Sequence, residues 1–372
     1  MAKIGILTQP LGFNYGGILQ NWALQQVLLS LGIQAVTIRQ ANGNIGFRIY
    51  KWVRALLIYV IKYTIKSPTR YSSKLPWDSS PFCHLIQFVK KHINHTSYLS
   101  LTNSNDILRM NLEKIIVGSD QVWRPRYNGK HLQSMYCDFL NDKSNISVIT
   151  YAASFGVSNW EYSETETQMA QKEIAKFAAI SVREESAILL CRKYLHSDAH
   201  LVLDPTLLLS KNKYEELISE KNLQCLPKKY IAVYILDFSH EKKTFVDTVC
   251  QKLGIEPFYF GNQSVDGKNI VPVETWLGAI MRSSFVITDS FHGTAFSINF
   301  RRPFISIINN ERGADRFESL LKMFGLEERM VDISTNQQID AIIDKQIIWH
   351  DVERIQEAER QNGLNFLKSN LR

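Results

Sequence analysis

The chain has 372 residues, 45% hydrophobic and 21% charged, which are ordinary proportions for a water-soluble globular protein of two domains. Its five scattered cysteines include no C-x-x-C pair, which argues against a disulfide framework or a zinc site and favours a reducing, cytoplasmic setting. The net charge of +7 favours anionic partners, but no nucleic-acid-binding motif or contiguous basic face accompanies it, so nucleic acid is not an expected partner.

The first predicted elements form a β-loop-α-β unit. A strand over 3–8 leads through a glycine-containing loop to a helix over 18–29, and a second strand follows. This order opens a doubly wound domain, although the loop lacks the G-x-G-x-x-G spacing of dinucleotide sites. Two interpretations of Asn14, Gly16 and Gly17 stay open: they contact a ligand, or the glycines only make the turn.

A basic amphipathic segment follows at residues 47–66. Its uncharged centre, 55–61, is too short to span a bilayer, and basic and aromatic residues flank it. One interpretation is peripheral docking on an anionic membrane surface, with Lys51, Arg54 and Lys62 at the headgroups. The other is an ordinary helix that packs on its own domain and keeps its lysines in water.

Arg183 stands at the carboxyl end of a predicted strand over 179–182, just before a helix. A guanidinium in that place can bind a carboxylate or a phosphate in bidentate fashion. The alternative is a salt bridge to Glu184 or Glu185. The residues alone leave both interpretations open.

A second strand–loop–helix junction surrounds His292. The strand 285–288 ends at a polar turn, and a helix begins near Gly293. Ligands of open α/β sheets bind at the carboxyl ends of strands, beside helix N-termini that attract anions. His292 would lie at that mouth between the hydroxyls of Ser290 and Thr294; the alternative is a histidine that only caps the helix.

The order of elements predicts an α/β fold with two doubly wound, Rossmann-like domains that face each other across a cleft. We expect the N-terminal domain over 1–210 and the C-terminal domain over 228–348. Residues 349–372 are rich in helix formers and predict a long terminal helix.

Six segments, in order along most of the chain, resemble the polysaccharide pyruvyl transferase family. Any one of them is a weak signal, but the set in this order is specific for the family. The segments are residues 3–20 with N-Y-G-G at 14–17, V-G-S-D-Q-V-W at 117–123, Y-A-A-S-F-G at 151–156, S-V-R-E-E-S at 181–186, L-D-P-T at 203–206, and T-D-S-F-H-G-T at 288–294 with Arg302-Pro303.

The resemblance implies a GT-B-like fold and a reaction. The family moves a pyruvyl group from phosphoenolpyruvate to a sugar as a ketal, during surface polysaccharide biosynthesis. This reaction requires no metal, and we expect no cofactor. The donor would lie on the second domain and the acceptor on the first. Acceptors on a lipid carrier, at the inner face of the cytoplasmic membrane, and soluble acceptors are both compatible with it.

The resemblance also assigns roles to residues. Arg183 matches the family's strand-end arginine and would bind the donor; His292 matches the histidine of the S-F-H-G-T segment and would act as general acid or base, titrating near neutrality. Further substrate contacts are expected from Asn14, Gly16, Gly17, Gln20, Asp120, Gln121, Ser290, Gly293, Thr294 and Arg316.

Two other classes of function remain as alternatives. A GT-B glycosyltransferase that uses a nucleotide-sugar would share the architecture, but it would need a base- and ribose-binding feature that the second domain does not display. A non-catalytic protein could use the basic segment 47–66 to dock on membranes or partners; the presence of both His292 and Arg183 argues against it.

Overall fold

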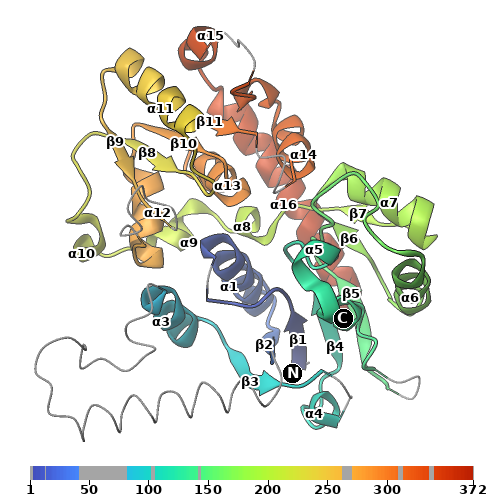
Figure 1. The fold of residues 1–372 in the computed structure, drawn as a ribbon. Helices are drawn as coiled ribbons and strands as arrows, with labels where there is room; N and C mark the ends of the chain where they lie inside the picture. The colour runs from blue at the N-terminus through green and yellow to red at the C-terminus, as the bar shows by residue number, and fades with distance from the viewer. Residues whose placement is uncertain are drawn as a thin grey trace, which may run out of the picture.

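The computed structural model describes residues 3–12, 14–41, 82–101, 105–140, 144–261, 270–308, 313–334 and 339–371. These residues form two five-stranded parallel sheets with helices packed around each (Figure 1). The basic segment 47–66 lies outside the described residues, so its membrane docking stays a prediction. None of the helices in the described ranges combines the length and apolar character that crossing a bilayer requires.

The first sheet has the strand order β3-β2-β1-β4-β5, and all its neighbours pair in parallel. Its central strand β1 is an apolar run that is buried after its first residue, as a parallel sheet covered on both faces requires. A short pair, β6 and β7, continues this sheet through bridges beside β5. The strands are β1 (Lys3–Leu7), β2 (Gln34–Gln40), β3 (His95–Leu99), β4 (Lys114–Val117), β5 (Ser147–Thr150), β6 (Ser181–Val182) and β7 (His200–Leu201).

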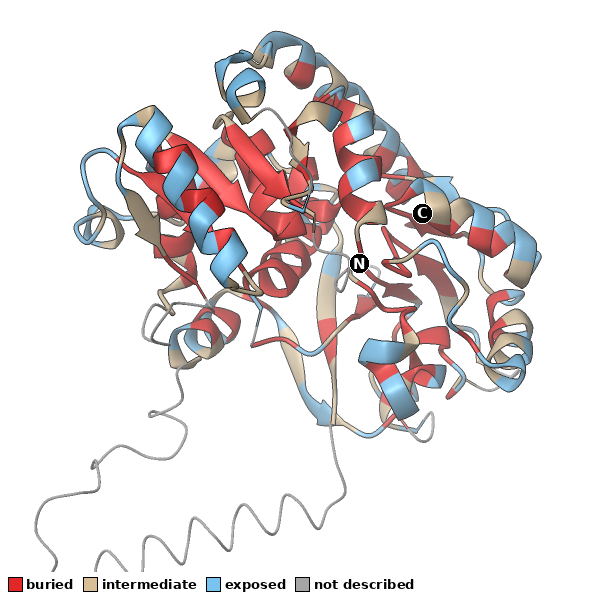
Figure 2. Ribbon diagram, turned by 45° about the horizontal axis from the view of Figure 1, so that its top comes forward, coloured by how far each residue is buried: buried red, intermediate tan, exposed pale blue. Residues whose placement is uncertain are grey.

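The second sheet has the order β12-β11-β10-β8-β9 and is also parallel throughout. Its central strands appear buried in Figure 2, because every residue of β8, β10 and β11 lies inside the protein. Two sheets of this kind confirm the predicted fold class. The strands are β8 (Ile231–Tyr234), β9 (Pro257–Tyr259), β10 (Phe285–Thr288), β11 (Phe304–Ile307) and β12 (Met330–Val331).

Four helices position the site: α1 (Tyr15–Ser30), α7 (Glu185–Leu195), α13 (Phe291–Asn299) and α14 (Asp315–Phe324). The others described are α3 (Cys83–His92), α4 (Asn105–Leu108), α5 (Pro125–Asn128), α6 (Glu164–Ile174), α8 (Pro205–Leu208), α9 (Lys211–Glu215), α10 (Glu220–Leu223), α11 (His240–Leu253), α12 (Val273–Arg282), α15 (Ile339–Asp344) and α16 (Trp349–Leu371), with short 3-10 turns at Gly129–His131, Gln133–Tyr136 and Glu327–Arg329.

One hydrophobic cluster of the described residues spans the two halves. Tyr15, on α1, stacks on Trp276, on α12, with ring centroids 5.4 Å apart, and its hydroxyl donates to the carbonyl of Val271 at 2.7 Å. The C-terminal helix α16 returns to the first half, where the Nζ of Lys114 donates to the carbonyl of Asn370 at 2.7 Å. The boundaries at 210, 228 and 348 stay predictions, but the strands of the first large sheet precede residue 210 and those of the second follow residue 228.

Candidate active site

A pocket of about 390 Å³ lies where the carboxyl ends of β1, β4 and β10 meet the first turns of α1, α13 and α14. Each half of the molecule supplies one side of it. We call these sides the first-domain wall, made of Gln9, Pro10, Asn14, Gly17, Asp120, Gln121 and Tyr127, and the second-domain wall, made of Leu236, Asp289, Ser290, Phe291, His292, Arg316 and Phe317.

The second-domain wall is built on the junction of β10 and α13. Ser290 is the N-cap of α13, and its hydroxyl accepts the N–H of Gly293 at 3.4 Å. A Cβ on Gly293 would lie 2.3 Å from the Oγ1 of Thr288, so only glycine lets the helix start this close to the strand. This close packing fixes the position of His292, which is in the first turn of the helix.

His292 is buried against the first domain. A Cβ on Gly16 would lie 1.9 Å from its Nδ1, so the glycine makes room for the imidazole. Its Nε2 lies 3.8 Å from the Oδ2 of Asp204, which is beyond hydrogen-bond distance. Burial lowers the pKa of His292 to about 4, and the attraction of Asp204 only partly opposes it. The imidazole is therefore neutral at pH 7, and the expected titration near neutrality is wrong for this pocket.

Arg183 directly follows β6, and three carboxylates surround its guanidinium. Its Nη1 donates to the Oδ2 of Asp204 at 2.7 Å, its Nη2 lies 3.4 Å from the Oδ1 of Asp120, and its Nε lies 3.9 Å from the Oε2 of Glu184. Burial alone would lower the pKa of Arg183, but these three carboxylates outweigh it and raise the pKa. Of the two alternatives for this arginine, the structure shows ion pairing, mainly with a residue that sequence analysis did not name as its partner.

Asp204 joins the two halves of the site. Its Oδ1 accepts hydrogen bonds from the N–H and the hydroxyl of Thr206. Its Oδ2 accepts hydrogen bonds from the Nη1 of Arg183 and from the hydroxyl of Ser119, the latter at 3.2 Å. Burial opposes ionisation, but His292, Arg183 and Thr206 hold the pKa of Asp204 below its ordinary value. Asp204 was not among the predicted site residues, although it belongs to the L-D-P-T segment; its place after β7, just before a helix-starting proline, was the available signal.

Arg316, in the first turn of α14, brings a cation to the second-domain wall. The carbon of its guanidinium lies 5.3 Å from the ring centroid of Phe291, and that of Arg183 lies 4.8 Å from the same centroid. Burial and the nearby charge of Arg183 lower the pKa of Arg316 to about 10, against the attraction of Asp120 and Glu184. A site with this balance favours the entry of an anion.

The structure separates the predicted site residues into two groups. Seven of them line the pocket: Asn14, Gly17, Asp120, Gln121, Ser290, His292 and Arg316. The others lie behind it. Gly16 packs on His292, and the side chain of Thr294 shares a buried hydrogen bond with that of Ser306. The Oε1 of Gln20 accepts a hydrogen bond from the Nη1 of Arg183 at 3.4 Å. A direct contact between Arg183 and the donor stays a prediction, since this side chain is not among those that line the pocket.

Asp289 is a pocket residue that sequence analysis missed. Its Oδ1 accepts the N–H of Leu236, and its Oδ2 accepts the N–H of Asp237 at 3.1 Å and the Nζ of Lys242 at 2.7 Å. These bonds tie the loop after β8 to the end of β10. The carboxylate therefore holds the wall in shape. Its position directly after the strand was the only sequence signal.

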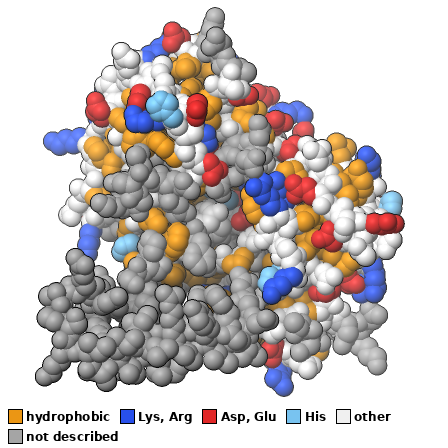
Figure 3. Space-filling model, viewed as in Figure 1, with side chains coloured by type: hydrophobic (Ala, Val, Ile, Leu, Met, Phe, Trp, Pro, Cys, Tyr) orange, Lys and Arg blue, Asp and Glu red, His pale blue; other side chains and the backbone are white. Residues whose placement is uncertain are grey.

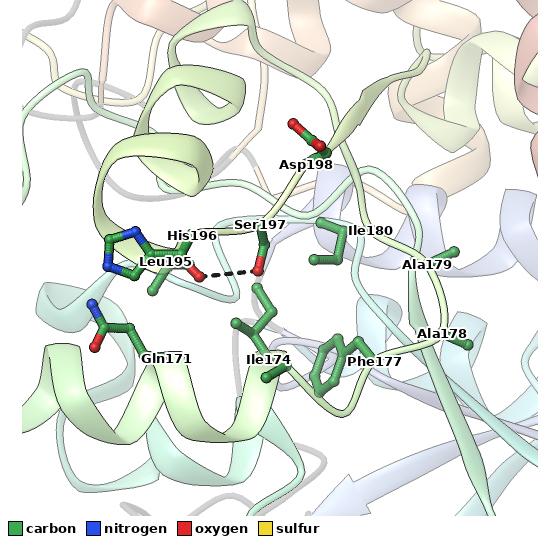
Figure 4. Close-up of a pocket in the computed structure, with 11 residues that line it drawn as sticks. Gln171, Ile174, Phe177, Ala178, Ala179, Ile180, Leu195, His196, Ser197 and Asp198 are labelled. Carbon is green, nitrogen blue, oxygen red and sulfur yellow. Dashed lines mark hydrogen bonds between the residues drawn. The ribbon is translucent and has the colours of Figure 1, made fainter.

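Another pocket, between α6 and the end of α7, does not have the features of an active site. Figure 4 shows the apolar side chains of Ile174, Phe177 and Ile180 around it, while the carboxylate of Asp198 points away. The hydroxyl of Ser197 donates to the carbonyl of Leu195 at 3.0 Å. Elsewhere on the described surface, basic and acidic side chains lie intermixed on the face in Figure 3. The residues that the structure describes contain no group of three or more His, Cys, Asp or Glu side chains placed to hold a metal ion.

Comparison with solved structures defines the fold class. The S. aureus MnaA–UDP structure aligns over 95% of this chain and 91% of its own, with a TM-score of 0.51 at 11% identity. A Listeria monocytogenes protein described as a UDP-N-acetylglucosamine 2-epimerase aligns over 97% of this chain and 91% of its own, with a TM-score of 0.50 at 9% identity. At such identities the likeness concerns the fold alone, which is the GT-B arrangement of two Rossmann-like domains.

The family follows from a separate comparison. The family model described as polysaccharide pyruvyl transferase matches residues 14–311. The chain therefore belongs to the polysaccharide pyruvyl transferase family, and the resemblance seen in its six segments is confirmed. Membership makes it a transferase. No curated protein sequence matches the chain.

Proposed function

We propose that this transferase moves a pyruvyl group from phosphoenolpyruvate to a sugar, as a ketal, during the synthesis of a surface polysaccharide. The observation that carries the proposal is that the two walls of the pocket present different kinds of side chain. The second-domain wall carries the guanidinium of Arg316 and the N-terminus of α13, and the first-domain wall is rich in amides, so the pocket suits an anionic donor on one side and a sugar on the other.

The second-domain wall suits the donor because phosphoenolpyruvate carries a phosphate and a carboxylate on three carbons. The guanidinium of Arg316 can bind either group through paired hydrogen bonds. The first turn of α13 adds the positive end of a helix dipole beside Ser290. Both features lie next to His292, where the proton transfers of ketal formation are needed.

The first-domain wall suits a sugar. The amides of Gln9, Asn14 and Gln121 provide donors and acceptors of the kind that hydroxyl groups pair with. The ring of Tyr127, 41% exposed, offers an apolar surface at the rim. This assignment places the acceptor on the first domain and the donor on the second, as expected from the family.

The reaction also explains why a buried, neutral histidine is useful. Donor binding brings negative charge beside His292, which raises its pKa and lets it carry the proton that the methylene carbon, C3, must receive. A sugar hydroxyl then bonds to C2, and a second hydroxyl displaces phosphate from the same carbon. Asp204, 3.8 Å from Nε2, would stabilise the imidazolium.

His292→Asn tests the proposal. We expect turnover to fall by about 10²–10⁴-fold, because proton transfer to C3 loses its donor, while the fold persists. The assay incubates the protein with phosphoenolpyruvate and a panel of nucleotide- and lipid-linked sugars and detects the ketal by mass spectrometry. Near-normal turnover of the variant would contradict the assignment. Stabilisation of the wild-type protein by nucleotide-sugars but not by phosphoenolpyruvate would favour a glycosyltransferase instead.

A further inference from the structure

Ketal formation from phosphoenolpyruvate moves two protons. Each of the two acceptor hydroxyls loses one, C3 gains one, and the departing phosphate gains the other. A single acid–base group would have to serve the donor carbon and both hydroxyls in turn. The reaction has two halves: addition of the first hydroxyl to the donor, and displacement of phosphate by the second. A second acid–base group on the acceptor side of the pocket would let both groups return to their starting protonation states after the second half.

Few titratable side chains of the described pocket qualify. Asp289 already accepts two backbone N–H groups and the ammonium of Lys242. Arg316 has no acceptor atom, and the phenol of Tyr127 lies at the rim. Besides His292, this leaves Asp120, which stands on the first-domain wall, where the sugar is expected.

The two oxygens of Asp120 are used differently. Its Oδ1 accepts the N–H of Gln121 at 2.8 Å and lies 3.4 Å from the Nη2 of Arg183. Its Oδ2 faces Gly17, where a Cβ would lie 3.5 Å away. Among the residues that the structure describes, none donates a hydrogen bond to this Oδ2. The carboxylate is therefore anchored through one oxygen and open to the pocket through the other.

The backbone of Asp120 supports a functional placement. Its φ is +84°, a value that residues with a side chain rarely adopt. The conformation is held by a bridge to Ala153 and, one residue earlier, by the hydroxyl of Thr8, which donates to the carbonyl of Ser119 at 2.7 Å. Strain of this kind is concentrated at functional sites.

We infer that Asp120 is the second proton-transfer residue, which accepts a proton from an acceptor hydroxyl as that oxygen bonds to C2 of the donor. The inference rests on the proposed function. In the first half, the O–H bond breaks towards Oδ2, the new O–C2 bond forms, and the electrons of the C2=C3 bond take a proton from the imidazolium of His292. In the second half, the other hydroxyl gives its proton to His292 and bonds to C2. The C2–O bond to phosphate breaks, and the phosphate leaves with the proton held by Asp120. Both groups end as they began.

Asp120→Gly is the sharpest test, because glycine accepts a φ of +84° without strain. At saturating donor and acceptor we expect turnover to fall by about 10²–10⁴-fold, with phosphoenolpyruvate affinity by calorimetry changed only a few-fold. Added formate, a small carboxylate base, should raise the turnover of this variant at least about tenfold. Nitrate has the same charge and a similar planar shape but almost no basicity, so it should restore nothing.

Two further variants complete the experiment. Asp247→Asn removes an exposed carboxylate on α11, which pairs with Lys243 at 2.7 Å, and should keep full activity. Asp120→Asn keeps the acceptor for the N–H of Gln121 and serves where the glycine variant does not fold; it should lose turnover to the same extent.

Two kinds of result overturn the inference and leave the proposed function standing. Turnover of either Asp120 variant within about fivefold of the wild type would exclude a proton-transfer role. Equal rescue by nitrate and formate would mean that Asp120 only balances the charge of Arg183. A wild-type protein that neither binds phosphoenolpyruvate nor forms a ketal from it would overturn the proposed function, and the inference with it.

Discussion

Two buried arginines lie against the same ring, that of Phe291, in different surroundings. Arg183 is enclosed by Asp204, Asp120 and Glu184, which raise its pKa despite burial. Arg316 lines the pocket, where burial and the charge of its neighbour lower its pKa to about 10. The same side chain, equally removed from water, is thus stabilised as a cation in one place and destabilised in the other.

The difference distinguishes two roles for a buried arginine: to hold the site together, or to bind a ligand in it. The charge of Arg183 is matched by carboxylates from three segments, so it ties together the loop after β4, the end of β6 and the start of α8. The charge of Arg316 is carried on the second-domain wall at a cost that an entering anion would reduce. We therefore expect Arg183 to hold the site together and Arg316 to bind the proposed donor, while a direct contact between Arg183 and the donor stays a prediction.

Removal of the scaffold arginine should have the largest effect. Arg183→Met would leave buried carboxylates without their cation, and we expect the free energy of unfolding to fall by about 3–5 kcal/mol. Urea unfolding followed by circular dichroism measures this. Arg192→Met, which removes an exposed arginine 3.3 Å from Asp198, is the control and should change stability by less than about 0.5 kcal/mol. A loss as small for Arg183 as for the control would mean that its ion pairs do not hold the site.

Removal of the pocket arginine should affect binding instead. For Arg316→Gln we expect phosphoenolpyruvate to bind about 10–100-fold more weakly, since a charge-assisted hydrogen bond contributes about 1.5–3 kcal/mol. The melting temperature should change little, because burial already disfavours the charged form of Arg316. Calorimetry and thermal denaturation measure the two. Lys322→Gln, an exposed change on the same helix, is the control. Unchanged affinity in Arg316→Gln would remove this side chain from the donor site.

Much of the fold could be predicted because its signals are local. The unbroken apolar run of β10, the Ser290 cap and the glycine after it mark a strand–helix junction within ten residues. β3 was missed because its sequence, H-T-S-Y-L, is largely polar and half-exposed at the edge of the sheet. An edge strand makes no apolar run and no clear alternation, so the sequence carried no signal for it.

The site was less predictable than the fold, because its chemistry depends on contacts between distant segments. Sequence placed His292 at the mouth of a sheet, but its lowered pKa comes from burial against Gly16 in the other domain. The strand-end position of Arg183 suits anion binding, and Arg316 was expected to contact the substrate. Only the position of Asp204 shows that Arg183 is held in a buried ion pair.

The smallest effect we expect is proton uptake when the donor binds. The pKa of His292 is about 4, held down by burial and by the charges of both arginines, so the imidazole is neutral at pH 6. Donor anions beside Arg316 would counter that charge and raise the pKa, and a group whose pKa rises on binding takes up protons, here up to about one per donor. Calorimetric titrations in two buffers of different ionisation enthalpy measure the number. Because the donor phosphate itself titrates in this range, the uptake by His292 is the difference between the wild type and His292→Asn. Equal proton uptake by the two proteins would mean that donor binding does not raise the pKa of His292. The donor anion would then not bind beside Arg316.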